Sequence, residues 1–322
     1  MSATIDYGKA QVSFYRTYAS PLRGITRIPE SDFAGRENVL FAAEVDVDVY
    51  GDNFLPAYTD GDNSNVVATD TMKNFVFAMA LEYEGPTLEG FLAFLGEAFL
   101  QTYPQMTSLR LRGRERPFAA AAALDGDRVV RSNVLFERAR GDAAFAEVRL
   151  GRAEGRTPSS SPTEDQRFVI SDSRSGREGL RLIKVTGSSF TRFVRDEYTT
   201  LPETVDRPLY LHLDVGWRYA DPADATGSAL SRYVASEQVR DHVECTFHDF
   251  NSRSIQQLVH EMGTRLLARF PQLAEVGFEA ENRLWETARR SETDTRRVVY
   301  TDPHPTYGRI GLVLRRDPDQ RG

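Results

Sequence analysis

Residues 60–74 read DGDNSNVVATDTMKN, and the rest of the chain can be understood outward from this stretch. Residues 60–65 are small and polar, which is typical of a turn. Residues 66–68 form a short strand-like run, and Thr69-Asp70 then begin an apolar periodic segment, as at the start of a helix. A helix start leaves backbone N–H groups without intrahelical partners, here beside a hydroxyl and a carboxylate. The stretch therefore predicts a site for a small polar molecule.

Composition limits the possible partners. The 322 residues are 40% hydrophobic and 27% charged, which is ordinary for a soluble globular protein. At roughly 100–200 residues per domain, the length predicts two domains. The net charge of −7 does not favour a nucleic-acid partner or an anionic membrane surface. The single cysteine, Cys245, excludes an intrachain disulfide and favours a reducing compartment.

The ends of the sequence resemble no targeting signal. Residues 1–16 contain no apolar core of a secretory leader, and no run approaches the ~20 apolar residues of a membrane helix. The last residues are not a peroxisomal signal. We therefore expect a cytoplasmic protein with no membrane partner.

Lysine is scarce. Only Lys9, Lys73 and Lys184 occur, so 37 of the 40 basic residues are arginines (40 minus 3). A basic group that must lose its proton cannot be Arg, whose pKa exceeds ~12. Each lysine is therefore either a candidate for proton chemistry or a residue kept for packing.

The first half reads strand, strand, helix, helix, strand, strand. Residues 8–18 and 38–51 alternate as two strands, expected to be antiparallel, around a loop at 19–37. Helices follow after Thr71 and over 87–104, ended by Gly85-Pro86 and Pro104. Strand-like runs occupy 107–118 and 128–150.

The second half repeats this order without a detectable sequence repeat. Strands are expected at 167–187 and 207–219, a loop at 220–229, helices at 233–249 and 254–270, and strands at 274–285 and 306–315. The Gly/Ser/Pro-rich residues 151–166 predict a mobile connection. We place the domains at 1–155 and 156–322, each with an α+β, ββααββ layout.

Several motifs resemble those of urate oxidases (uricases), members of the tunnelling-fold (T-fold) superfamily. The motifs follow the family's order along the whole chain. They are Tyr7-Gly8-Lys9, Asp62-Asn63-Ser64 with Val67-Ala68-Thr69-Asp70-Thr71-Met72-Lys73-Asn74, Asp196-Glu197-Tyr198-Thr199-Thr200-Leu201 running to Asp206-Arg207, Ile255-Gln256, Asn282, and Tyr307-Gly308 with Ile310. The second and third of these are specific to the family.

The resemblance implies fold, reaction and assembly together. It implies two tandem T-fold units with antiparallel sheets and helices on the outer face, assembled into a tunnel-shaped homotetramer. The implied reaction oxidises urate with O₂ and water to 5-hydroxyisourate and H₂O₂, with no metal or flavin cofactor. Active sites would lie at subunit interfaces, with Lys9, Thr69 and Asp70 from one chain and the purine-binding residues from its neighbour.

The expected purine-binding residues suit a planar anion. The Arg207 guanidinium can donate two parallel bonds to a heterocycle, although an ion pair with Asp206 or Glu203 is the simpler interpretation of an isolated arginine. Ser254 with Gln257 predicts a capping box, which puts Ile255 and Gln256 in the first helical turn, where an anion is favoured. Phe190 resembles the family's stacking aromatic, although Phe193 is close enough to be its core partner.

The expected catalytic residues are Lys9, Thr69 and Asn282. By the resemblance, Lys9 and Thr69 relay the proton that urate loses, and Asn282 holds O₂ or water. From local sequence alone, Thr69 is equally well interpreted as an N-cap. The family often has His two residues after this Asn, but here Leu284 stands there, and its side chain cannot relay a proton. His260 and His304 are candidates to replace that histidine.

Two other functions remain open from the sequence. A related purine or pterin T-fold enzyme is one, although its zinc-dependent members need Cys/His ligands that show no recognisable spacing here. A non-catalytic purine-binding T-fold tetramer is the other, and the leucine at position 284 motivates it.

Overall fold

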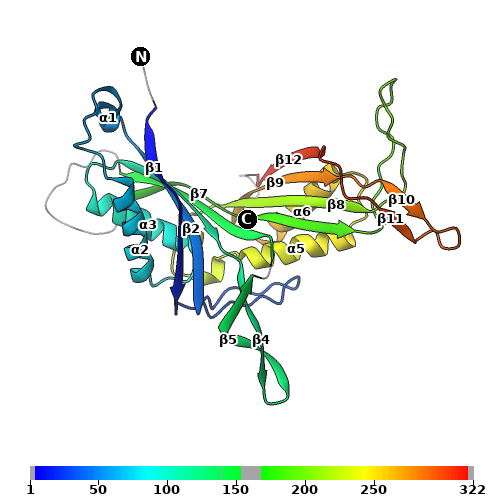
Figure 1. The fold of residues 1–322 in the computed structure, drawn as a ribbon, viewed down its shortest axis with the longest axis horizontal. Coiled ribbons are helices and arrows are strands. Elements are labelled where there is room, and N and C mark those ends of the chain that lie inside the picture. The colour runs from blue at the N-terminus through cyan, green and yellow to red at the C-terminus, as the bar shows by residue number, and fades with distance from the viewer. Residues whose placement is uncertain (1–3, 139, 154–167, 318–322) are drawn as a thin grey trace. The chain divides into compact units, whose positions relative to one another are not determined.

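The structure is a computed structural model that describes residues 4–138, 140–153 and 168–317 (Figure 1). The chain divides into two compact units. Unit 1 comprises Met1–Arg27, Phe33–Ser175 and Arg218–Val234, and unit 2 comprises Ile28–Asp32, Gly176–Trp217 and Ala235–Gly322. Most of the expected connection, residues 154–166, lies outside the described residues, so the boundary at 155/156 stays a prediction.

Unit 1 is built on antiparallel strands in the order β1-β2-β3-β6, with β7 next to β6. Their bounds are β1 Asp6–Thr17, β2 Leu40–Tyr50, β3 Ser108–Glu115, β6 Ala143–Arg152 and β7 Phe168–Lys184. Before α2 come η1 Asp52–Phe54 and α1 Leu55–Thr59, and α4 Ala223–Thr226 and η3 Leu230–Arg232 belong to the segment returning to this unit. The short α4 lies where the sequence predicted only a loop.

Two helices cover one face of the unit 1 strands. Helix α2 (Thr69–Glu82) packs on β1, and α3 (Leu88–Thr102) packs on β3 and β6. Val45, Val47 and Val49 of β2 are fully buried, as their alternation with acidic residues predicts. The core therefore lies between the helices and alternate strand positions.

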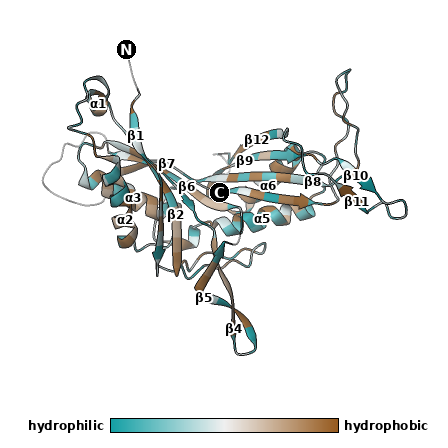
Figure 2. Ribbon diagram, in the orientation of Figure 1, coloured by the Kyte–Doolittle hydropathy of each residue, from teal (hydrophilic) through white to brown (hydrophobic). Residues whose placement is uncertain are grey.

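The predicted strand at 128–150 is wrong as a single element. It is two strands, β5 (Arg128–Arg138) and β6, which flank the turn at Gly141-Asp142. Strand β5 pairs with β4 (Phe118–Asp125) in a hairpin whose turn contains Gly126 at φ +58°. Figure 2 shows hydrophobic stretches on the β4–β5 hairpin, and Val129 and Val134 of β5 are 76% and 77% exposed.

Unit 2 repeats the order of elements. Its strands run β7-β8-β9-β12, with β8 at Leu209–Tyr219, β9 at Leu273–Arg283 and β12 at Gly308–Arg315. Helices α5 (Ser236–Asp249) and α6 (Ile255–Arg269) pack together, and α6 also packs on β9 and β12. An unpredicted hairpin, β10 (Thr287–Arg290) with β11 (Val298–Tyr300), lies between β9 and β12. The ββααββ order is thus confirmed in both halves.

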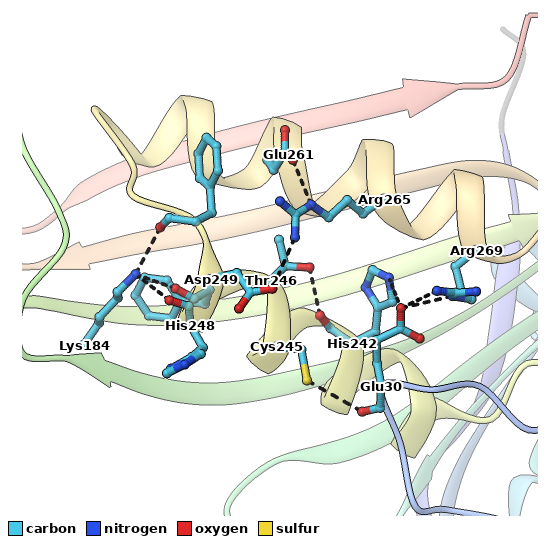
Figure 3. Close-up of polar contacts among 12 residues, drawn as sticks. Glu30, Lys184, His242, Cys245, Thr246, His248, Asp249, Glu261, Arg265 and Arg269 are labelled. Carbon is cyan, nitrogen blue, oxygen red and sulfur yellow. Dashed lines mark hydrogen bonds and ion pairs between the residues drawn. The ribbon is translucent and has the colours of Figure 1, made fainter.

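Part of the expected 19–37 loop belongs to unit 2. Glu30 accepts from Arg269 Nε at 3.2 Å, and its carboxylate lies 3.9 Å from Nε2 of the buried His242 (Figure 3). The Glu30 carbonyl is 3.7 Å from Sγ of Cys245. Burial lowers the pKa of His242, which keeps this imidazole neutral near pH 7. These contacts fasten residues 28–32 to α5 and α6.

Lys184 closes the C-terminal end of α5. Its ammonium donates to the carbonyls of Phe247, His248 and Phe250 at 2.8, 3.0 and 3.0 Å (Figure 3). These carbonyls belong to the last turn, where no intrahelical donor reaches them. The positive charge also suits the negative end of the helix dipole. This lysine therefore has a structural role.

No helix among the described residues is long and apolar enough to cross a membrane.

Replacing Lys184 with Met should lower the free energy of unfolding by about 1–3 kcal/mol, because three carbonyls lose a charged donor. Lys73→Met is the matched control, since Lys73 is a partly exposed lysine paired with the exposed Asp70, and it should change stability by less than ~0.5 kcal/mol. Urea unfolding of both variants measures this. Equal effects of the two substitutions would contradict the structural role.

Candidate functional site

The expected purine-binding residues of unit 2 lie on segments tied together by backbone hydrogen bonds. Phe190 N donates to Thr204 O at 2.8 Å, and Thr204 N returns a bond to Phe190 O at 3.0 Å. Ser189 N donates to Ser252 O at 2.8 Å, which brings the segment before α6 against the Phe190 loop. The structure therefore brings Phe190, Arg207 and the start of α6 into one region of unit 2.

Arg207 is free of the ion pair that the sequence left open. Its Cζ lies 5.4 Å from the centre of the Phe190 ring, and its Nε is buried with no hydrogen-bond partner among the described residues. Burial lowers the pKa of the Arg207 guanidinium from its ordinary value. The ordinary pKa of arginine is so high that the side chain still carries its charge. A buried, unpaired donor is costly unless a ligand meets it. Arg207 is therefore available to an anion.

Phe190 packs face to face on Phe193, with ring centroids 4.9 Å apart and an interplanar angle of 12°. Phe193 is thus the packing partner that the sequence suggested. Phe190 itself is only half-buried, so part of its ring is open to a ligand. The stack fixes the plane of the Phe190 ring, which a planar ligand needs from an aromatic platform.

Asp206 holds the Phe190 loop instead of pairing with Arg207. Its carboxylate accepts from Thr186 Oγ1 at 2.6 Å and from Gly187 N at 2.7 Å. These bonds, that of Thr186 first, lower the pKa of Asp206. Arg207 N in turn donates to Ser188 O at 2.8 Å. Sequence reasoning missed this anchoring role, because the loop partners lie about twenty residues earlier in the chain.

The start of α6 has the predicted cap. Ser254 Oγ accepts from Gln257 N at 3.1 Å, while Gln257 Oε1 accepts from Arg253 N at 2.9 Å, one residue before the N-cap. Ile255 is buried and packs, whereas the side chain of Gln256 is exposed. Gln256 therefore stands at the first turn of a capped helix, where its amide is free to contact an anion.

Asn282 lies near the end of β9, opposite Gly308 of β12. Its Oδ1 is buried with no hydrogen-bond partner among the described residues. This is the second unpaired polar atom in the expected ligand-binding set, and unlike Arg207 it is an acceptor. The two are suited to a ligand or water that both donates and accepts.

None of the candidates for the missing histidine is tested by the geometry. Leu284 is 39% exposed just beyond β9. His304 Nε2 lies 3.0 Å from Glu286 Oε1, two residues after Leu284, and His260 is exposed on α6. His304 therefore lies beside the segment that carries Leu284, but it is engaged with Glu286.

Lys9, Thr69 and Asp70 belong to unit 1. Lys9 lies on β1 opposite Val47, and the Tyr7 hydroxyl accepts from Val67 N at 3.1 Å, which holds the approach to α2 against this strand. The charge of Lys9 contributes to lowering the pKa of Asp70, although the hydrogen bond from Lys73 is the larger cause. These contacts bring Lys9 close to the start of α2.

Thr69 is not the N-cap. Ala68 occupies that position with φ −55° and ψ 135°, and Thr69 is the first helical residue. The Thr69 side chain is exposed, and the start of α2 has no side-chain cap hydrogen bond. Because capping does not use this hydroxyl, it is available for other chemistry.

Metal-ligand clusters were also sought. Within residues 4–138, 140–153 and 168–317, no group of three or more His, Cys, Asp or Glu side chains is arranged to hold a metal ion.

Two successive ββααββ units, each with antiparallel strands and helices packed on one face, define a T-fold protein. The sequence model of the uricase family matches residues 5–140 and 173–311. The chain belongs to the uricase family.

Similar proteins agree with this assignment. A uricase from Haloferax volcanii is 47% identical over 98% of this chain and 100% of its own length. A uricase from Halalkalicoccus jeotgali is 46% identical over 94% of this chain and 95% of its own length. A crystal structure of urate oxidase from Bacillus sp. TB-90 superposes with a TM-score of 0.91 at 40% identity, covering 97% of this chain and 100% of that one.

Proposed function

We propose that this chain oxidises urate with O₂ and water to 5-hydroxyisourate and H₂O₂. The observation that carries the proposal is the pairing of Phe190 with Arg207, whose buried Nε has no hydrogen-bond partner in the described part of the chain. A flat, anionic purine would stack on the ring and accept from the guanidinium. Gln256 at the positive end of α6 would complete the recognition of the ligand edge.

Lys9 and Thr69 act on the proton that urate loses, and Asn282 holds the second reactant. The proton passes through the Thr69 hydroxyl to Lys9, and this hydroxyl is open to that role because capping of α2 does not use it. The unpaired Oδ1 of Asn282 orients water or O₂ beside the purine. Asp70 stands next to Thr69 and orders the same helix start.

The reaction balances with these reactants alone. Urate gives up two electrons to O₂, which becomes H₂O₂, and water supplies the hydroxyl of 5-hydroxyisourate. We propose that no metal or flavin takes part, because the deprotonated purine is itself electron-rich enough to reduce O₂. The protein supplies orientation and control of water.

We further propose a homotetramer in which each site combines two chains. Unit 1 of one chain would provide Lys9, Thr69 and Asp70, and unit 2 of its neighbour would provide Phe190, Arg207, Ile255, Gln256 and Asn282. Support comes from the division of these residues between the two units. The proposed partners are therefore urate, O₂ and further copies of this chain.

The direct test uses dialysed, metal-free and flavin-free protein mixed with urate and O₂. We expect urate absorbance to fall while peroxide appears in equal amount. Tight urate binding without turnover would instead identify a purine-binding tetramer, the alternative suggested by Leu284. If urate does not bind, both interpretations fail and another purine or pterin must be sought.

Mixing two inactive variants tests the composite site. Lys9→Met removes the proton acceptor, and Arg207→Ala removes the ligand contact. After dissociation and reassembly together, sites that join Arg207 of the first variant with Lys9 of the second should be active. A mixture that stays inactive, while each variant assembles normally, would place each site within a single chain.

A further inference from the structure

The residues of the two units correspond at a fixed spacing along the chain, here called the register, although the sequence shows no detectable repeat. Leu22 and Arg36 exchange backbone hydrogen bonds exactly as Phe190 and Thr204 do, and Leu22 and Phe190 are 168 positions apart (190 minus 22). Sequence reasoning found no repeat because side chains differ at most positions, but backbone contacts recur at this spacing.

Strand irregularities recur at the same spacing. Gln11, with φ 59°, donates its N–H to Asp46 Oδ1 at 2.7 Å in unit 1. Gly179, with φ 80°, donates to Asp214 Oδ1 at 2.6 Å in unit 2. Both members of the pair are shifted by 168 (179 minus 11, 214 minus 46). A left-handed residue facing a carboxylate is uncommon enough for this coincidence to fix the alignment of the strands.

Contacts at the ends of α3 and α6 continue the register, and the spacing between corresponding residues of these helices is 167. Arg152 Nε donates to Met106 O at 3.1 Å, and Arg316 Nε donates to Leu273 O at 3.1 Å, so the acceptors are 167 positions apart (273 minus 106) and the arginines 164 (316 minus 152). Both arginines also donate to the last turn of the preceding helix, at Leu100 and Leu267. With this register, residues 67–70, VATD, align with 234–237, VASE.

The register assigns counterparts to six of the proposed site residues. Those of the ligand-binding residues Phe190, Arg207, Gln256 and Asn282 lie in unit 1, and those of Lys9 and Thr69 lie in unit 2. In this order the counterparts are Leu22, Val39, Glu89, Glu115, Arg177 and Ser236.

The unit 1 counterparts cannot hold an anion. Val39 has no charge where unit 2 has Arg207, and Leu22 is 1% exposed. Glu89 is the second residue of α3, as Gln256 is of α6, and it is 6% exposed. Its carboxylate accepts from its own backbone N–H and from the Tyr233 hydroxyl at 3.1 Å. An internal carboxylate thus meets the start of α3.

The unit 2 counterpart of Lys9 and Thr69 is likewise engaged. Arg177 Nη1 donates to Ser236 Oγ at 3.0 Å, and Arg177 is buried. A guanidinium cannot serve as a proton acceptor, so this pair cannot perform the relay proposed for Lys9. Each unit therefore keeps one half of the machinery and has the other half closed by its own side chains.

We propose that unit 1 contains a closed copy of the ligand half-site of unit 2, in which the buried Glu89 side chain fills the ligand position at the start of α3. That the half-site of unit 2 binds a ligand rests on the proposed function. The closure itself rests on Glu89 and its contacts in unit 1, so it can be tested without enzyme activity.

The surroundings of Glu89 make its charge costly. Glu115 of β3 repels it, although Arg36 Nη1 pairs with Glu115 at 3.1 Å, and the buried Tyr83 and Tyr233 hydroxyls are its other titratable neighbours. Burial is the main cause that raises the pKa of Glu89 to about 7, against bonds from Ser175, its own N–H and Tyr233. The group therefore stabilises the fold most below pH ~4.5 and loses that contribution as pH rises through about 7.

Glu89→Gln tests the buried carboxylate. Between pH 4.5 and 8, the unfolding constant of the wild type should rise relative to that of Glu89→Gln by up to ~300-fold, the factor that corresponds to a pKa moving from 4.5 to about 7. Glu82→Gln, at an exposed position near the end of α2, should track the wild type at every pH. Parallel curves for the wild type and Glu89→Gln would overturn the proposal.

Chemical rescue tests whether the Glu89 side chain fills this position. At pH 5, Glu89→Ala should be destabilised and then recover several-fold in its unfolding constant on addition of formate, compared with chloride at equal ionic strength, because the small carboxyl compound replaces the lost carboxyl group. Glu82→Ala should show no formate-specific gain. If formate stabilises both variants equally, or neither, the Glu89 carboxyl group does not fill a ligand position and the proposal fails.

Discussion

Arg207→Ala should lower kcat/KM for urate by about 10²–10³-fold, mostly through a higher KM. The reason is that the purine loses its charged hydrogen-bond donors, each worth about 1.5–3 kcal/mol when buried. Steady-state kinetics with urate, together with equilibrium binding of a non-oxidisable urate analogue, measure the two contributions separately.

Arg207→Lys is the matched control, because it keeps the positive charge but loses the planar fork. We expect it to recover only part of the affinity. Since Asp206 bonds to Thr186 and Gly187 rather than to Arg207, neither variant should disturb the Phe190 loop. A change in kcat/KM below threefold for Arg207→Ala would remove this residue from the binding site.

Lys9→Met should lower kcat by about 10²–10⁴-fold and change analogue binding little, because a positioned proton acceptor contributes a factor of this size. Lys9→Arg is the more informative variant. It retains the charge on β1 but cannot lose its proton, so it should be nearly as inactive as Lys9→Met. Single-turnover kinetics at saturating urate isolate this step from binding.

An active Lys9→Arg enzyme would show that Lys9 supplies charge rather than proton transfer. Thr69→Ala should fall in the same kinetic class as Lys9→Met, since its hydroxyl is exposed at the helix start and not used in capping. Thermal unfolding of each variant verifies that the loss is not one of folding.

Local patterns were enough to predict much of the fold. The alternation of valines with acidic residues in 38–51 predicts β2 because one face of that strand is dry, and Ser254 with Gln257 predicts the start of α6. The continuous strand at 128–150 was wrong because a small turn at Gly141-Asp142 outweighs the β-forming composition on both sides. The strands of the β10–β11 hairpin have only four and three residues, so no periodicity signals them.

The site was predictable as residues but not as contacts. Motifs named Arg207, yet only the folded loop shows that Asp206 turns toward Thr186 and leaves Arg207 unpaired. Similarly, the local sequence allowed Thr69 to be an N-cap, and the backbone angles place Ala68 at that position instead. Long-range partners lie beyond the reach of local patterns, which is also why the internal register of the two units was missed.

The carbonyl cradle of Lys184 has a consequence for chemical modification. An ammonium whose protons point at three carbonyls has no lone pair to offer while these bonds are made. With so few lysines in the chain, acylating or PEG-coupling agents are left with Lys73, Lys9 and the terminal amine. The fold thus limits amine-directed conjugation to few positions, and it leaves a narrow margin between attaching a label at α2 and inactivating the proposed proton acceptor on β1.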